Sequence, residues 1–253
     1  MDKAFYRTIF TVIVLGCLNL PTWANRSAQY EIKLGRQISA IILGKYTQSN
    51  DLSMIRYVNL VGQSIVSTSG RKDIRYHFTI LESETPNAIA CPGGYVFITT
   101  GLLNKLNSES ELAGVLAHEI AHINQKHILN KLSGGEEANQ NILLSLFGAK
   151  NTLMNVALGE LSNNVLTMIF EKGLDEQDEY EADIAAILYL QNTGYYSQSY
   201  LDMITRLHNT EYRHSTTHPP IKKRQLAIRS IYPKQSLTTG VQLTKRFNLQ
   251  KGT

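Results

Sequence analysis

The segment HEIAH at residues 118–122 constrains this chain more than any other feature. Successive residues of an α-helix turn through about 100°, so His118 and His122 differ by about 40° and one turn. Both imidazoles can therefore reach one ion lying about 2.0–2.1 Å from each ligating nitrogen. Glu119 lies beside them, where a carboxylate can act as general base toward water. The alternative, two buried histidines satisfied by backbone groups, leaves Glu119 without a role. The segment predicts a zinc site.

The residues around this segment predict that it is helical. Ser108 and Glu111 match a capping box, the pattern that begins many helices. The pattern ends at Gly134 and Gly135, so we expect one continuous helix between the cap and these glycines. The apolar residues at helical spacing predict a helix buried along much of its length. They are Leu112, Val115, Leu116, Ile120 and Ile123.

A catalytic zinc ion takes a third protein ligand and leaves its fourth position for water. Glu179 and Asp183 are four residues apart in a second helical segment, so they share a face. We expect Glu179 to bind the zinc, and Asp183 to accept the other ring N–H of one ligand histidine. Glu181 is about 200° away from Glu179 on that helix and cannot point at the same ion. The other nearby acids are expected on a solvated face: Asp175, Glu176 and Asp178.

Three other histidines have less specific surroundings. His127 is nine residues from His118, on the opposite side of a continuous helix, so we expect a structural role for it. His77 occupies an outward position of a predicted strand and is expected to be exposed. His218 precedes Pro219, which stiffens the backbone before it. The His218 side chain could donate to a developing oxyanion, occupy the open metal position, or belong to a plain surface loop.

The rest of the chain predicts an α+β fold, mainly helical with a small sheet beside the helix of interest. Apolar residues at helical spacing indicate helices at residues 27–46 and 52–67. Alternating apolar residues at 73–81 indicate a half-buried strand, and the turn at residues 91–94 separates two further short strands. No internal repeat or Pro/Gly-rich linker divides residues 25–253, which we interpret as one domain.

The first 24 residues have the pattern of a secretory signal. Two basic residues precede an apolar run at residues 9–20, and Ala24 offers a small residue for cleavage. The run of about 12 residues falls short of the roughly 20 that span a membrane. Cys17 is the alternative processing site, as the lipidated cysteine of a lipoprotein. With cleavage after Ala24, Cys91 is the only cysteine left and no intramolecular disulfide can form.

The charge pattern argues against nucleic-acid binding. The formal net charge is +4, and the 25 Lys and Arg residues are scattered along the chain. A nucleic-acid-binding protein of this size typically gathers its basic residues in one patch or stripe. We therefore expect no nucleic-acid partner.

Six stretches carry a resemblance to a known family. They read EIKLGRQISA from residue 31, YVNLVGQSI from 57, NAIACPGGYVFITTGLL from 87, HEIAHINQKH from 118, DEYEADIAA from 178 and THPPIKKR from 217. In this order they resemble the zinc metallopeptidase family that includes HtpX, BepA and the CaaX prenyl proteases, peptidase family M-48. The resemblance covers about residues 29–232 and implies a gluzincin-type catalytic domain. It implies one zinc ion per chain, with His118, His122 and Glu179 as ligands and Glu119 as general base.

The resemblance also implies a setting and partners. It places the strand at residues 95–100 at the edge of the cleft, where a substrate peptide would add as a further strand. It implies a periplasmic protein, with association with the outer membrane as an option, that acts on unfolded or misassembled envelope proteins. His218 is then either a transition-state donor or an inhibitory latch. The sequence lacks the membrane spans of the HtpX and CaaX branches and the repeat domain of BepA. We therefore do not expect a CaaX-processing role.

The sequence therefore predicts an exported zinc metalloendopeptidase that takes part in quality control of envelope proteins. Two alternatives stay open. One is a zinc-bearing periplasmic chaperone or assembly factor that rarely cleaves, and the other is a latent protease gated by His218. The apolar segment at residues 136–172 carries no catalytic residue, and it either covers the cleft or completes the core.

Overall fold

The computed structural model describes residues 23–69, 71–134, 167, 173–209 and 218–252. Its helices are α2 (Trp23–Lys45), α3 (Leu52–Thr68), α4 (Thr100–Lys105), α5 (Glu109–Asn124), α6 (His127–Gly134), α9 (Glu176–Thr193), α10 (Gln198–His208), α11 (Ile221–Ile231), α12 (Lys234–Leu237) and α13 (Thr244–Lys251). Its strands are β1 (His77–Leu81), β2 (Ala88–Cys91) and β3 (Tyr95–Thr99), with a short 3₁₀ turn, η1 (Pro92–Gly94), between the last two. Within these ranges, no helix is both long enough and apolar enough to cross a membrane.

Two sequence predictions fall on residues that the structure does not describe. The signal peptide expected at residues 1–24 lies outside the described ranges apart from its last two residues. The segment at residues 136–172 lies outside them apart from residue 167. Both stay predictions.

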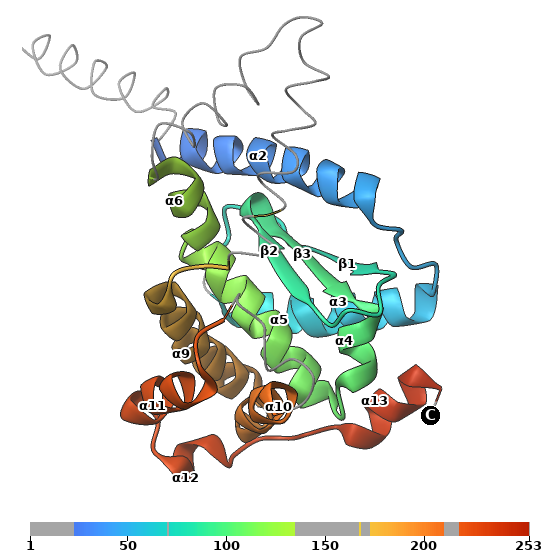
Figure 1. The fold of residues 1–253 in the computed structure, drawn as a ribbon, viewed down its shortest axis with the longest axis vertical. Helices are drawn as coiled ribbons and strands as arrows, with labels where there is room; N and C mark the ends of the chain where they lie inside the picture. Colours follow the sequence, from blue (N-terminus) through green and yellow to red (C-terminus); the bar gives the residue numbers. More distant parts are fainter. Residues whose placement is uncertain (1–22, 70, 135–166, 168–172, 210–217, 253) are drawn as a thin grey trace, which may run out of the picture.

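The fold class is the one expected, α+β with a small mixed sheet. In Figure 1 the three strands lie beside α5, and α9, α10 and α11 gather on the other side of that helix. The helix expected at residues 27–46 is α2, and the one expected at 52–67 is α3, which Asp51 caps by accepting a hydrogen bond from the Met54 N–H at 3.0 Å. Most of the residues expected to face inward from them are fully buried: Leu34, Ile38, Ile42, Val58, Val61 and Ile65.

The sheet has the strand order β1-β3-β2, with β3 parallel to β1 and antiparallel to β2. The sequence placed the strand at residues 95–100 at the edge of the cleft, and this is wrong. Residues 95–99 form β3, the central strand, because β1 pairs along its other side. The edge strand beside α5 is β2 instead. The alternation that predicted β1 is confirmed, since Phe78 and Ile80 are buried and His77 is exposed.

The turn between β2 and β3 depends on its glycines. Gly93 and Gly94 have φ angles of 75° and 97°, in the left-handed region that side chains disfavour. A Cβ atom on Gly94 would also lie 2.0 Å from the carbonyl oxygen of Arg75, just before β1. Cys91, before this turn, is fully buried, as free cysteines usually are.

Helix α5 runs through the middle of the molecule, and every residue from Glu109 to Ile123 is buried. It packs on the sheet through β2 and β3, on α3, and along the length of α9 (Figure 1). The hydroxyl of Ser108 caps it by accepting from the Glu111 N–H at 3.2 Å, which confirms that half of the capping box. The Glu111 carboxylate instead accepts from the Asn107 N–H, one residue earlier than expected, at 2.8 Å.

The single long helix expected up to Gly134 is wrong, because α5 ends at Asn124 and α6 begins at His127. Lys126, between them, has a φ angle of 60°, which no right-handed helix contains. The Gln125 N–H still bonds to the Ala121 carbonyl, and the chain then turns. The segment contains no glycine or proline that would have indicated the break.

Candidate metal centre

Helices α5 and α9 bring three candidate ligands together. Nε2 of His118 lies 3.0 Å from Nε2 of His122, and these two atoms lie 3.5 and 3.6 Å from the two carboxylate oxygens of Glu179. Two atoms that bind the same tetrahedral zinc ion lie about 3.3 Å apart. All three residues are at least 96% buried, at 4%, 3% and 1% exposure. Two imidazoles and one carboxylate at these separations fit a single metal ion.

The exposed position of Glu181 agrees with the choice of Glu179 as the inward acid. The side chain of Glu181 is 45% exposed and that of Glu179 is 2% exposed. Asp175 and Glu176 are exposed as expected, and Asp178 is half-buried.

Asp183 lies where the sequence placed it, against the ring of His118. Its Oδ1 is 3.1 Å from Nδ1 of His118. Arg224 donates to both oxygens of Asp183, from Nε at 2.8 Å and from Nη2 at 2.6 Å. Burial alone would raise the pKa of Asp183, but Arg224 and His118 hold it well below its usual range. An ionised Asp183 accepts from the Nδ1–H of His118 and holds that ring with Nε2 toward His122 and Glu179.

Tyr200 and Arg224 also belong to this group, although the sequence did not predict a role for either. The Tyr200 hydroxyl donates to Asp183 Oδ1 at 2.6 Å and lies 2.9 Å from Nδ1 of His118. Arg224 also donates to that hydroxyl, at 2.9 Å. Arg224 belongs to the stretch THPPIKKR, one of those that carry the family resemblance, so the sequence held a signal for it. Tyr200 lies in α10 with no motif around it, and only the fold brings it to His118.

His122 has its own partner, His127. Their Nδ1 atoms lie 2.9 Å apart, and both side chains are buried. The expectation that His127 lies on the far side of the helix from the site is wrong, because the break at Lys126 turns its ring back toward His122. Burial, together with the neighbouring His118, holds the pKa of His122 well below its usual value, so this ring is neutral.

Glu119 lies on the ligand helix α5, and its carboxyl group is close to the backbone of Ala90 in the edge strand β2. It is 7% exposed, and burial raises the pKa of its carboxyl above the usual value, although the nearby His118 and His218 lower it in part. A raised pKa brings a carboxylate closer to the value that suits proton transfer near neutral pH. Two cavities, with volumes of about 170 and 50 Å³, meet at Glu119.

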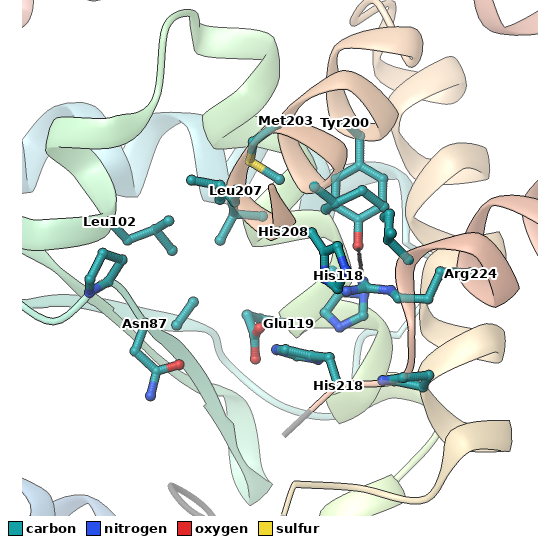
Figure 2. A pocket seen from close by; sticks show the side chains of 16 residues that line it. Asn87, Leu102, His118, Glu119, Tyr200, Met203, Leu207, His208, His218 and Arg224 are labelled. Carbon is teal, nitrogen blue, oxygen red and sulfur yellow. Dashed lines mark hydrogen bonds between the residues drawn. The ribbon is translucent and has the colours of Figure 1, made fainter. Parts of the chain in front are cut away.

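Both cavities also reach His218, and Figure 2 shows its ring in front of Glu119 and His118. Nδ1 of His218 lies 2.5 Å from Oε2 of Glu179, and its side chain is 39% exposed. This contact with a candidate ligand favours a role for His218 in the site over the surface-loop alternative. His118, Glu179 and His218 also offer ligand atoms that all lie within 4.8 Å of one another. His218 is thus close enough to Glu179 to serve either as a donor in the cleft or as a latch.

Comparison with known proteins names the family to which this site belongs. The model of peptidase family M48 matches residues 54–232. The chain belongs to peptidase family M48. The family resemblance read from the sequence is therefore confirmed. Members of this family are metal-dependent peptidases, in agreement with the donor set of His118, His122 and Glu179.

Several individual relatives match most of this chain at low identity. The chain is 28% identical over 201 residues to the beta-barrel assembly-enhancing protease of Escherichia coli O157:H7, which covers 76% of this chain and 40% of that protein. It is 28% identical over 183 residues to the mitochondrial metalloendopeptidase OMA1 of Schizosaccharomyces pombe, covering 70% and 52%. It is 24% identical over 198 residues to the protease HtpX of Legionella pneumophila, covering 72% and 70%. The match thus spans less than half of the beta-barrel assembly-enhancing protease.

Proposed function

We propose that the protein is a zinc-dependent metalloendopeptidase. The observation that carries the proposal is the convergence of His118, His122 and Glu179 with Glu119 beside them in a cleft. Two imidazoles and a carboxylate form a ligand set that catalytic zinc ions use. The names of the relatives, a protease and a metalloendopeptidase, support the same class of reaction.

The residues of the cleft divide the reaction among them. A bound zinc ion would polarise the scissile carbonyl and acidify water. Glu119 removes the proton from the attacking water and returns it to the leaving amine. Asp183 and His127 hold the rings of His118 and His122 with Nε2 toward Glu179. The edge strand β2, which lines the second cavity, offers its backbone to a peptide that adds as a further strand.

We further propose residues 25–253 as the catalytic domain, exported to the periplasm by the signal at residues 1–24. The substrates would be unfolded or misassembled envelope proteins, near or at the outer membrane. Support comes from the signal pattern and from relatives named beta-barrel assembly-enhancing proteases.

The first prediction concerns Glu119. The Glu119→Gln variant should retain one zinc ion per chain, because the three ligands are intact, and should lose casein cleavage by about 10²–10⁴-fold. Metal analysis and a casein assay measure the two properties. The matched control is Glu181→Gln, an exposed acid, which should keep both. Full casein cleavage by Glu119→Gln would show that Glu119 is not the general base. If that variant instead complements a deletion strain without cleaving casein, the result favours the chaperone alternative.

A second candidate, a latent protease, is favoured by the contact of His218 with Glu179 at 2.5 Å. A latch that occupies a ligand carboxylate lowers the activity of the resting enzyme. His218→Ala should therefore raise the rate of casein cleavage several-fold. A transition-state donor would instead make the same variant slower. Initial rates of wild type and His218→Ala, at equal zinc content, separate the two roles. An unchanged or lower rate contradicts the latch.

A further inference from the structure

The larger cavity beside Glu119 has a lining that metal binding does not explain. Its volume is about 170 Å³. Figure 2 shows Met203 and Leu207 of α10 and Leu102 of α4 along the side of the cavity away from Arg224. Six aliphatic or thioether side chains form its apolar wall: Leu102, Val115, Met203, Ile204, Leu207 and Ile221. None of these side chains carries a group that binds a metal or moves a proton.

Of the acidic and basic residues that line this cavity, Glu119 belongs to the metal site and Arg224 already has partners. The guanidinium of Arg224 donates to Asp183 and to the hydroxyl of Tyr200. That hydroxyl in turn donates to Asp183. A charged side chain entering the cavity would lose its water without gaining a free partner of opposite charge at the apolar wall, which is costly. An apolar side chain would gain about 25 cal/mol for each Å² that it buries.

The position of the cavity relates it to the bond that is cut. Val115, in its wall, is four residues before Glu119 on the same helix, so the two side chains lie one turn apart on one face. Asn87, directly before the edge strand β2, and Ala88, the first residue of β2, also line the cavity. Because alternate side chains of an added strand point the same way, a peptide lying on β2 would direct one side chain next to the scissile bond into this cavity.

The size of the cavity limits what can enter. A protein cavity of about 150 Å³ holds a molecule of benzene. At about 170 Å³ the cavity accommodates side chains of the size of leucine, methionine or phenylalanine. An alanine side chain would leave most of the apolar wall without contacts.

We propose that this cavity is the specificity pocket of the enzyme, and that it selects an apolar residue of leucine to phenylalanine size directly beside the scissile bond. The inference rests on the proposed function and extends it to a class of substrate. It fits a protein that acts on unfolded chains, since leucine, methionine and phenylalanine are mostly buried in folded proteins and become accessible in unfolded ones.

The test uses the zinc-loaded full-length protein and a set of internally quenched peptides that differ at the two residues flanking the cleaved bond. Mass spectrometry locates the cleaved bond, and fluorescence gives kcat/KM. We expect leucine, methionine or phenylalanine on one constant side of the bond, with alanine at that position at least about 10-fold poorer and lysine or aspartate poorer still. Peptides that vary only at the other flanking residue should differ much less.

Substitutions in the wall assign the preference to this cavity. Leu207 is half-buried at the wall, and Leu207→Trp should fill the cavity and shift the preference toward alanine. Met203→Ala should enlarge it and favour phenylalanine over leucine, which provides a second variant if Leu207→Trp does not fold. Leu226→Trp is the matched control, because Leu226 is 69% exposed on α11 and lies outside the cavity, so it should keep the wild-type profile.

The outcomes separate this inference from the proposed function. Cleavage whose residue preference is the same in wild type, Leu207→Trp and Met203→Ala would overturn the specificity pocket and leave the endopeptidase intact. Failure of both zinc-loaded wild type and zinc-loaded His218→Ala to cut any peptide or casein would overturn the proposed function, and the pocket with it. A preference that moves in the two wall variants and not in Leu226→Trp supports the pocket.

Discussion

Tyr200 shows how one residue can matter without belonging to any motif. Its hydroxyl joins Asp183, Arg224 and His118 into one buried hydrogen-bonded group. Its ring packs against α5 at Gly114, where a Cβ atom would lie 2.7 Å from the ring. Gly114 is one turn before His118, so the absence of a side chain there lets the phenol reach the histidine. At Tyr200 the ring therefore contributes to packing against α5, and the hydroxyl contributes hydrogen bonds to the group around His118.

At the residue scale we predict that Tyr200→Phe weakens zinc binding by about 10-fold, since residues that orient a ligand histidine contribute about 10–100-fold to metal affinity. The ring and its packing on Gly114 are retained, so the variant should still fold, with a thermal midpoint lowered by the loss of the hydrogen bonds to Asp183 and Arg224. Competition with a chromogenic chelator measures the affinity. Tyr232→Phe is the control, since Tyr232 is half-buried at the end of α11, away from the cavities. Equal zinc affinity in all three proteins would show that Asp183 orients His118 without Tyr200.

At the scale of elements, the break between α5 and α6 determines which residue contacts His122, the second candidate ligand. A continuous helix would carry His127 away from His122, whereas the left-handed backbone at Lys126 turns it back. Nε2 of His127 lies 3.6 Å from Glu181 and 3.8 Å from Asp178, beyond hydrogen-bond length. The Nδ1 contact with His122 is therefore the closest polar contact described for this ring.

We predict that His127→Phe lowers zinc affinity by about 10–100-fold, because His122 loses the partner that fixes its ring. The phenyl group retains most of the buried volume, so the protein should still fold. Isothermal titration of the zinc-free protein gives the affinity directly, and circular dichroism checks the helix content. His77→Phe, at an exposed position of β1, serves as control. Wild-type zinc affinity in His127→Phe would show that the contact between the two Nδ1 atoms does not contribute to metal binding.

At the scale of the whole molecule, Glu109 joins three distant parts of the chain. It is fully buried at the start of α5, and it accepts hydrogen bonds from Tyr57 of α3, from Tyr195 at 2.6 Å, and from Arg246 of α13. Burial alone would raise the pKa of Glu109, but Arg246 and the two tyrosines lower it below its usual value of 4.5. The C-terminal helix α13 is thus tied to the helix that carries the metal site.

This cluster predicts a dependence of stability on pH. Because the folded pKa of Glu109 lies below the unfolded value, its contribution to stability is fully present above about pH 4.5 and is lost as the pH falls through the folded pKa. In Arg246→Gln this contribution shrinks, so the free energy of unfolding at pH 7 should fall by about 1–2 kcal/mol, and the loss should be smaller at acidic pH. Urea unfolding of the zinc-free protein at several pH values measures it. Arg229→Gln, on the exposed face of α11, should behave as wild type, and a pH-independent loss in Arg246→Gln would contradict this account.

The sequence by itself determined the parts of this protein that follow from helical periodicity. The spacing of His118 and His122, the pairing of Glu179 with Asp183, and the rejection of Glu181 all depend on residues within one or two turns of each other. Local backbone geometry sets such relations, so the fold can place the helices but cannot change which residues share a face. The family resemblance and the α+β class follow from the same local patterns, taken in order along the chain.

Only the tertiary structure decided the relations between residues far apart in sequence. It made β3 the central strand and β2 the edge, since pairing with β1 has no local signal. It placed Tyr200 and Arg224 against Asp183, and it broke the long helix at Lys126, where no glycine or proline marked the turn. The apolar faces of α5, α9 and α10 are buried against one another. A polar group enclosed by this packing can bond only to the groups that the packing brings next to it.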